Sequence, residues 1–319
     1  WAVDVHRLDG PWPTPDERAL AAASAQVEAL ADGTRVIADA LAFAALPALA
    51  QAHAERLRWV ALVHHPLHLE TGLAAVARSR LRHSETRALQ CSRQVVVTSA
   101  STAADVAAMG VAPARIAVVE PGTDPLPRPA DVRAADRSGP VRLLCVATLT
   151  PRKGHAVLLQ ALTQLGTLDW VLHGVGSLTR DPETAARVMA FSASPMLSGR
   201  VRWHGEVDAA TLQAHYAAAD LLVLPSLHEG YGMVVAEALA AGLPVLATSA
   251  GALAHTVPAD AGLQVPPGDA QALQAALARL ITEPGLRARL AAGARAAARR
   301  LPTWDEQAAR FGTVLQGVA

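Results

Sequence analysis

The stretch from residue 220 to residue 245 reads DLLVLPSLHEGYGMVVAEALAAGLPV. It begins with an apolar run, continues through a loop with two glycines and an alanine-rich helical segment, and ends at a glycine before a second apolar run. Continuous apolar runs of this kind are typical of strands buried on both faces of a parallel sheet. The order strand, loop, helix, strand predicts an α/β fold whose loop lies at the carboxyl end of a parallel strand, where such sheets bind ligands.

Short β-type runs alternate with helical stretches rich in Ala, Leu and Arg from one end of the chain to the other. This alternation indicates parallel sheets with helices on both faces. After residue 271 the pattern is only helical, with Pro284 and the pair Pro302-Thr303 as helix-start signals. The strands that we expect span residues 3–8, 34–39, 58–64, 94–98 and 115–119 in the first half, and residues 141–147, 169–173, 200–204, 220–224 and 244–247 in the second.

A chain of 319 residues exceeds one average domain, and its composition changes in the middle. Residues 121–129 read PGTDPLPRP, and polar residues follow as far as Pro140, a composition that builds neither strand nor helix. We therefore expect one Rossmann-like domain over residues 1–136 and a second over residues 137–302. A last helix over residues 303–319 is expected to pack back toward the first domain.

Charge and composition exclude several classes of protein. Lys and Arg together number 28, as do Asp and Glu, so the chain lacks the basic surplus on which nucleic-acid binding depends. Hydrophobic residues make up 51% of the sequence, enough for a packed core. No segment reaches about 18 uninterrupted apolar residues, so no membrane span is expected. Only two cysteines occur, Cys91 and Cys145, and the apolar setting of Cys145 favours a reducing, cytoplasmic location.

The loop with the two glycines has the features of an anion site. Gly230 and Gly232, on either side of Tyr231, allow the backbone to approach a ligand closely. The amides of Gly232, Met233 and Val234 then lie at the start of a helix, where they have no partner within the helix. Such amides, together with the helix dipole, bind phosphate groups.

Two carboxylates flank this anion site. Glu229 lies in the loop, and Glu237 lies a little over one turn inside the helix with its side chain inclined back toward the helix start. A carboxylate beside a phosphate would repel the ligand unless it accepts hydrogen bonds from hydroxyl groups, such as those of a ribose or a hexose. The pair therefore predicts a sugar nucleotide. The plainer alternative is that both glutamates only complement the helix dipole and stay solvated.

This stretch resembles the retaining glycosyltransferases of family 4, which have the GT-B arrangement of two Rossmann-like domains facing across a cleft. The resemblance extends from about His64 to the end of the chain and is strongest over residues 141–268. It implies that Glu229 meets the hydroxyl groups of the donor sugar and that Glu237 meets the ribose. Three further stretches carry the resemblance: VRWHG at residues 201–205, YAAAD at residues 216–220 and GLQVPPGD at residues 262–269.

Lys153 is the only lysine of the chain. Residues 144–155, LCVATLTPRKGH, resemble the family's loop after the first strand of the second domain, where a Lys before Gly binds the donor diphosphate. The family usually has Arg at the position of Thr148, so one of two usual cations is missing from its place. Either Arg152 compensates from four residues further on, or the diphosphate binds more weakly. Thr148, Arg152 and Lys153 are all expected on the donor-binding side.

Three histidines follow the apolar run at residues 60–63. The resemblance implies that a His at this strand end faces the donor sugar from the first domain, and His64 is the closest match. His64, His65 and His68 also suggest a metal site, but their loop lacks the carboxylate or Cys partner that such a site needs, so no metal is expected. Helix amides and Lys153 are expected to bind the diphosphate instead, without a metal ion or another cofactor.

The beginning of the chain departs from the family pattern. Family members open with a strand, a Gly-rich loop and a helix that help to form the acceptor side of the cleft. Here residues 3–8 resemble the second strand, and no pair of glycines precedes Gly110. The resemblance therefore implies a truncation of about one βα unit, roughly 30 to 40 residues.

The segment at residues 73–89 predicts a helix with a basic row beside an apolar stripe. Such a helix can lie on an anionic membrane, where lipid acceptors are found, and the alternative is an ordinary amphipathic surface helix. The basic row contains Arg78, Arg80, Arg82, His83 and Arg87, and the apolar stripe contains Leu73, Val76, Ala77, Leu81 and Ala88.

Together, these patterns predict an enzyme that moves a hexosyl group from a nucleoside diphosphate sugar to a hydroxyl acceptor, with retention as the resemblance implies. Glu229, His64 and Lys153 are the expected catalytic residues. One alternative is a non-catalytic or impaired sugar-nucleotide-binding protein, and another is a different GT-B enzyme such as a sugar-nucleotide epimerase. A phosphorylase is disfavoured because its cofactor requires a lysine, and the only lysine lies in the phosphate loop. A cytoplasmic protein is expected, with or without association at the inner face of the membrane.

Overall fold

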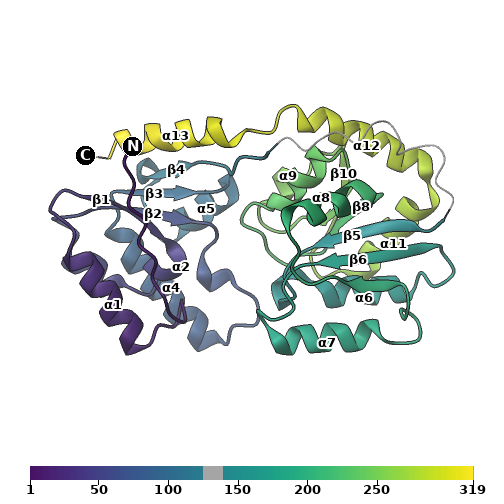
Figure 1. Ribbon diagram of the computed structural model, residues 1–319, viewed down its shortest axis with the longest axis horizontal. Helices are drawn as coiled ribbons and strands as arrows, with labels where there is room; N and C mark the ends of the chain where they lie inside the picture. The colour runs from purple at the N-terminus through teal and green to yellow at the C-terminus, as the bar shows by residue number, and fades with distance from the viewer. Residues whose placement is uncertain (125–138, 319) are drawn as a thin grey trace. The chain divides into compact units, whose positions relative to one another are not determined.

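The computed structural model describes residues 1–124 and 139–318, which divide into two compact units (Figure 1). Unit 1 comprises residues 1–120 together with the chain from Gln307 onward. Unit 2 comprises the described residues between Pro121 and Glu306. The domain boundary expected between residues 136 and 137 lies outside the described residues. Each unit is built around one parallel sheet.

The sheet of unit 1 has the order β1-β2-β3-β4, and every neighbouring pair of strands is parallel. Its strands are β1 (Arg35–Asp39), β2 (Arg58–Val63), β3 (Gln94–Val97) and β4 (Ile116–Val118). Because all four strands run in the same direction, their carboxyl ends lie at one edge of the sheet. Asp39 at the end of β1 and His64 directly after β2 both lie at that edge.

Side chains of this sheet alternate between two apolar clusters, as the period of a β-strand requires. Ala61 and Val95 pack with Phe43 and Leu89 from the helices on one face, whereas Val60 and Val96 pack on the other face. The elements of unit 1 outside the sheet are α1 (Glu17–Glu28), α2 (Ala40–Phe43), α3 (Pro47–Ala52), the short 3-10 turn η1 (Leu67–Leu69), α4 (Ala75–Gln90), α5 (Ala100–Ala108), the turn η2 (Pro113–Arg115) and α13 (Trp304–Gln316).

Residues 3–8 do not form the strand that the sequence predicts, so that prediction is wrong. Val3 and Val5 alternate with polar residues as strand residues do, but both are exposed, Val5 at 90%. No strand among the described residues pairs with this segment, so it has neither a ladder of hydrogen bonds nor a buried face to hold it extended. Regular structure begins at Asp16, whose carboxylate accepts a hydrogen bond from the amide of Ala19 and caps α1.

The sheet of unit 2 has the order β10-β9-β8-β5-β6-β7, again with all neighbours parallel. The chain adds β6 and β7 on one side of β5, then crosses to β8 on the other side and continues to β9 and β10. The carboxyl ends of β5 and β8 therefore form a switch point, where α/β sheets open a ligand-binding crevice.

The strands of this second sheet are β5 (Val141–Val146), β6 (Trp170–Val175), β7 (Val201–Trp203), β8 (Leu221–Leu224), β9 (Val245–Thr248) and β10 (Gly262–Val265). Strand β10 is not among the strands expected from the sequence.

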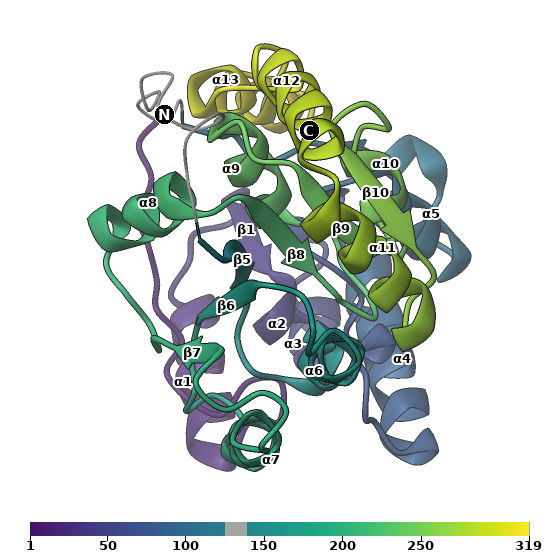
Figure 2. The same ribbon diagram turned by 90° about the vertical axis from the view of Figure 1, so that its right-hand side faces the viewer.

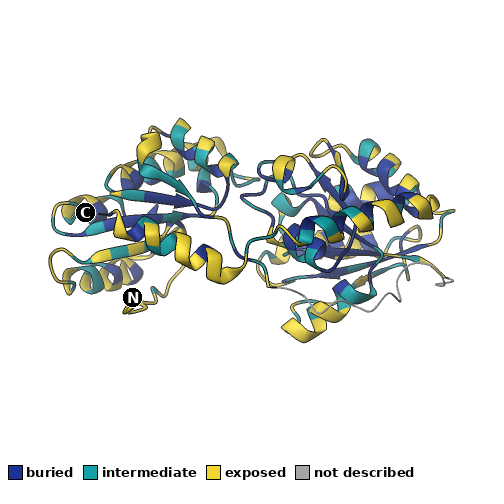
Figure 3. Cartoon of the chain, turned by 90° about the horizontal axis from the view of Figure 1, so that it is seen from above, coloured by how far each residue is buried: buried dark blue, intermediate teal, exposed yellow. Residues whose placement is uncertain are grey.

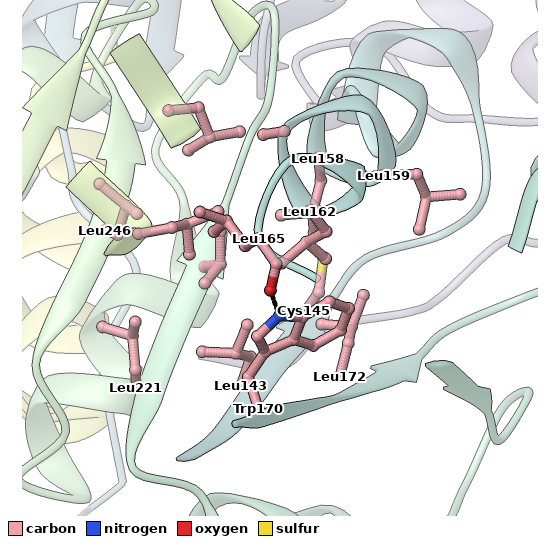
Figure 4. Close-up of a cluster of buried hydrophobic side chains, with 14 of the residues drawn as sticks. Leu143, Cys145, Leu158, Leu159, Leu162, Leu165, Trp170, Leu172, Leu221 and Leu246 are labelled. Carbon is pink, nitrogen blue, oxygen red and sulfur yellow. Dashed lines mark hydrogen bonds between the residues drawn. The ribbon is translucent and has the colours of Figure 1, made fainter. Parts of the chain in front are cut away.

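Helices cover both faces of this second sheet (Figure 2), and an apolar cluster lies on each face. On one face, Leu143, Leu172 and Trp170 pack with leucines of α6, and the indole of Trp170 donates a hydrogen bond to the carbonyl oxygen of Leu165 at 2.9 Å (Figure 4). Burial raises the pKa of the Cys145 thiol in the same core to about 12, so this side chain packs as an apolar group. The other elements of unit 2 are η3 (Pro151–Lys153), α6 (His155–Thr163), α7 (Pro182–Ser192), α8 (Ala209–Ala218), α9 (Met233–Ala240), α10 (Leu253–Thr256), α11 (Ala270–Thr282) and α12 (Pro284–Ala298).

The last helix, α13, is part of unit 1 over most of its length. Leu315 on α13 and Val318 directly after it lie in the same buried cluster as Val60 and Val96 of the sheet, while the rest of α13 is mostly exposed (Figure 3). The amide of Thr123 donates to the carbonyl oxygen of Pro302 at 2.8 Å, so the segment that leaves unit 1 and the segment that returns to it run side by side.

Replacing Leu315 with Ala tests the packing of α13. We expect Leu315→Ala to lower the free energy of unfolding of unit 1 by about 2 to 4 kcal/mol, because a buried side chain is removed from an apolar cluster. Gln316→Ala, an exposed position on the same helix, should change it by less than about 0.5 kcal/mol. Urea denaturation monitored by circular dichroism measures both, and equal losses would contradict the packing of α13 on the sheet.

Candidate functional site

Two loops meet at the switch point of the second sheet, one after β5 and one after β8. The amide of Leu227 in the second loop donates to the carbonyl oxygen of Arg152 in the first at 2.7 Å. Gly154 adopts a left-handed conformation with φ of 69°, and a Cβ atom there would lie 2.0 Å from the carbonyl oxygen of Pro225. The two loops can approach this closely only because residue 154 is a glycine.

Glu229 is the centre of a buried ion cluster that joins the two loops. Its Oε1 accepts a hydrogen bond from Lys153 Nζ at 2.6 Å and another from Ser226 Oγ at 2.7 Å. Arg152 Nη1 lies 3.3 Å from Oε2 and donates to the carbonyl oxygen of His228 at 2.8 Å. The cluster therefore places the cations of the first loop directly over the carboxylate of the second.

Lys153 and Arg152 determine both the ionisation state of Glu229 and the net charge of this cluster. Burial by itself would raise the pKa of Glu229, but Lys153 and Arg152 outweigh it and hold that pKa below its usual value. Glu229 is therefore a carboxylate at neutral pH. Two cations face one carboxylate, so the cluster has a net charge of about +1 and attracts an anion.

The amino end of α9 provides the second element of the site. Gly232 begins the helix in a left-handed conformation with φ of 84°, and no side chain caps it. Among the described residues, the first amides of α9 are thus not engaged by a capping side chain, and Met233 is 43% exposed. Gly230 is buried and Tyr231 is half-buried in the loop just before this helix. Amides at a helix start bind an anion through their N–H groups and the helix dipole.

Glu237 lies on α9 and is held by a residue from another helix. Its Oε2 accepts a hydrogen bond from the hydroxyl of Tyr216 on α8 at 2.6 Å. Burial, together with the charge of Glu237, raises the pKa of Tyr216, so the phenol stays protonated and donates. One carboxylate oxygen is thereby engaged, and the half-buried side chain is fixed in orientation.

Most of the predicted donor-binding residues therefore gather in unit 2 on two loops and one helix. Arg152, Lys153 and Glu229 are in direct contact, and residues 230–234 continue the loop of Glu229 into α9. Thr148 is half-buried in the first of these loops. Arg152 reaches the same carboxylate as Lys153, and its compensation for the Arg expected at residue 148 stays a prediction.

His64 belongs to a separate pair in unit 1. Its Nε2 lies 3.1 Å from Oδ2 of Asp39, at the carboxyl edge of the first sheet. The hydrogen bond to Asp39 raises the pKa of His64, and the same bond lowers the pKa of Asp39. Both side chains are more than half exposed, so the charged form of this pair is accessible to a ligand.

The expectation that His64, His65 and His68 lack a carboxylate partner is wrong. Each of them has a carboxylate partner: Asp39 lies beside His64, Glu70 is 3.4 Å from His65, and Glu85 is 3.6 Å from His68. The three carboxylate partners are different residues. Within the described part of the chain, these histidines are not among the side chains that gather closely enough to hold a metal ion.

The basic row of the segment at residues 73–89 lies on α4 as predicted, with Arg78, Arg80 and Arg82 exposed. Val76 in the predicted apolar stripe is 82% exposed, whereas Ala88 is fully buried. Leu73, Ala77 and Leu81 are partly buried, so the stripe is fully buried only at its carboxyl-terminal end. Contact with a membrane stays a prediction. No helix among the described residues is both long enough and apolar enough to cross a bilayer.

Three partners in these clusters were not predicted from the sequence: Ser226, Tyr216 and Asp39. Ser226 and Tyr216 lie inside the stretches that carry the family resemblance, but nothing in their spacing shows which carboxylate they bond. Asp39 ends a strand that is parallel to the strand before His64. This shared edge was a usable signal, because carboxyl ends of neighbouring parallel strands lie together.

Two family models match the chain. The model described as Glycosyl transferases group 1 matches residues 131–297, and the model described as Glycosyltransferase Family 4 matches residues 1–125. The first alone spans more than half of the 319 residues. The chain therefore belongs to the group 1 glycosyl transferases, and the match of residues 1–125 to the family 4 model confirms the resemblance read from the sequence.

Individual relatives agree with this family. The chain is 38% identical over 208 residues to D-inositol 3-phosphate glycosyltransferase of Xylanimonas cellulosilytica, covering 61% of this chain and 49% of that protein. It is 29% identical over 274 residues to MMP alpha-(1->4)-mannosyltransferase of Mycolicibacterium hassiacum, covering 81% of this chain and 64% of that protein. The chain spans about half the length of the inositol phosphate glycosyltransferases that it matches.

Solved structures confirm the class of fold. Sucrose-phosphate synthase from Thermosynechococcus elongatus matches with a TM-score of 0.76 and 25% identity, over 88% of this chain and 73% of that chain. Anabaena Alr3699/HepE in complex with UDP and glucose matches with a TM-score of 0.76 and 20% identity, over 94% of this chain and 81% of that chain. The two parallel-sheet α/β units are thus those of a GT-B glycosyltransferase.

Asp39→Asn tests the charged pair at the edge of the first sheet. The substitution removes the carboxylate that favours the imidazolium, so the pKa of His64 should fall toward its ordinary value. Titration of the His64 ring signals by NMR measures the change, with the signals of the exposed His83 on α4 as an internal control. An unchanged pKa of His64, or an equal shift of His83, would contradict the pairing.

Proposed function

We propose that this protein transfers a hexosyl group from a nucleoside diphosphate sugar to a hydroxyl acceptor, with retention of configuration. The observation that carries the proposal is the convergence of Arg152, Lys153 and the amino end of α9 at the switch point of the second sheet. A diphosphate presents several negative oxygens within a few ångströms of one another. Two cations and a row of helix amides suit such a group.

In this proposal the cationic side of the site acts on the leaving group. Negative charge develops on the departing nucleoside diphosphate as the bond to the sugar breaks. Fixed cations and amides aimed at that position stabilise the charge without rearranging during the reaction. Lys153 and Arg152 are already oriented by Glu229, so less ordering is required when the donor binds. We propose that this step proceeds without a metal ion.

The two glutamates are assigned to hydroxyl groups on either side of the diphosphate. Glu229 is ionised, and we propose that it orients the donor sugar through its hydroxyl groups rather than acting as a nucleophile. Glu237 has one oxygen bonded to Tyr216; the other can accept from the ribose hydroxyls. The relatives support a donor of this chemistry, since Anabaena Alr3699/HepE has been crystallised in complex with UDP-glucose.

We assign His64 to the donor sugar as well, acting from unit 1. Because Asp39 raises its pKa, its ring carries a proton over a wider range of pH and can donate a hydrogen bond to a sugar oxygen.

Isothermal titration with two probes tests the donor site. Lys153→Ala should weaken binding of both UDP and inorganic pyrophosphate by about 10- to 100-fold, the effect of losing one charge-assisted hydrogen bond. Glu237→Gln should weaken the binding of UDP by roughly 10-fold and leave the binding of pyrophosphate unchanged, because the substitution alters only the ribose contact. The glutamine oxygen can still accept from Tyr216, which keeps the helix contact in place.

Glu183→Ala, an exposed glutamate of the same unit, is the matched control and should leave both affinities unchanged. Loss of pyrophosphate binding in Glu237→Gln would show that the ribose assignment is wrong. Incubation with UDP-glucose and other sugar nucleotides, followed by mass spectrometry, then separates the candidate functions. Transfer to a hydroxyl acceptor supports the glycosyltransferase, binding without turnover supports a sugar-nucleotide-binding protein, and epimerised sugar supports an epimerase.

A further inference from the structure

Three histidines of unit 2 come together from different elements. His173 lies on β6, His204 directly follows β7, and His215 lies on α8. In the parallel register, His173 pairs with Arg202, and side chains two residues apart on a strand share a face. His173, Arg202 and His204 therefore project on one face of the sheet, and α8 brings His215 to the same place.

The geometry of this cluster is close to that of metal ligands. His173 Nδ1 and His204 Nε2 are 2.9 Å apart, and the ring centres of His204 and His215 are 4.4 Å apart. One ring nitrogen from each of the three residues lies within 4.8 Å of the other two. In the described part of the chain, this is the group of His, Cys, Asp and Glu side chains that gathers closely enough to hold a metal ion.

We propose that His173, His204 and His215 bind a divalent first-row transition metal ion of the zinc type through three imidazole nitrogens. Zinc–nitrogen bonds of about 2.0–2.1 Å in a tetrahedral site place the ligand nitrogens roughly 3.3 Å apart. One pair already lies within half an ångström of that separation. His204 is exposed and His215 is half-buried, so small rotations of these rings can bring the third nitrogen to the ion.

Proton placement is compatible with this proposal. The contact between His173 Nδ1 and His204 Nε2 requires a proton on one of the two nitrogens. When the ion binds, that ring carries its proton on its other nitrogen, so both facing lone pairs point to the metal. Each imidazole stays neutral, which is the form that binds zinc.

Three protein ligands leave one position of a tetrahedral site open. His173 and His215 line a cavity of about 570 Å³ between the sheet and α8, and the same cavity is lined by Arg142 and Arg202. Both arginines are exposed. A small anion or a water molecule can therefore occupy the fourth position, with the guanidinium groups beside it.

This site is distinct from the three histidines after β2 and from the donor site, for which no metal is expected. The cluster on β6, β7 and α8 uses none of the residues assigned to the donor. His215 does adjoin Tyr216, the hydroxyl partner of Glu237.

Calorimetric titration of the intact chain with zinc chloride tests the proposal. We expect one zinc ion per chain, and we expect His204→Ala and His215→Ala each to weaken its binding by at least about 10-fold, since even indirect contacts to metal ligands change affinity by that factor. His83→Ala, an exposed histidine in unit 1, should leave the affinity unchanged. Unchanged thermal melting of the metal-free variants verifies that they fold.

Cobalt(II) provides a second readout. It should give the intense visible absorption of a tetrahedral site in the unsubstituted chain and lose it in His204→Ala. Zinc binding that is equally tight in His204→Ala, His215→Ala and the unsubstituted chain would overturn the proposal. So would a cobalt spectrum of purely octahedral character.

Discussion

The close approach of two loops at the switch point of the second sheet is the constraint on which the donor site depends. It requires a residue without a side chain at position 154, since any Cβ there would collide with the carbonyl group of Pro225. Parallel pairing of β5 with β8 sets where the two loops begin. The sheet topology therefore determines which charged residues meet.

Once the loops are together, their charges stabilise one another. Leaving Glu229 buried without a cation would cost several kcal/mol, and placing Lys153 and Arg152 together without a carboxylate would cost repulsion. The three together retain a positive surplus that suits an anion. Adjacent to them, the uncapped start of α9 adds N–H donors. The same contacts that stabilise the loops thus prepare them for a diphosphate.

Sequence reasoning predicts this part of the molecule well and other parts poorly, for identifiable reasons. The buried parallel strands are visible as apolar runs, and the loop residues from Glu229 to Val234 lie in an unbroken stretch with a strong family resemblance. The strand predicted at residues 3–8 is wrong, because the alternation of Val3 and Val5 with polar residues does not reveal whether a neighbouring strand exists. The contact of Tyr216 with Glu237 and the cluster of His173 with His204 and His215 depend on strand register and helix placement. Spacing along the chain carries no information about either.

The position of the bound diphosphate is the central prediction for this protein. A crystal structure of the protein with UDP tests this directly. We predict that the diphosphate oxygens lie within hydrogen-bond distance of Lys153 Nζ and of the amides of Met233 and Val234, with the ribose against Glu237. UDP bound with its phosphates away from the loops after β5 and β8 would contradict the account.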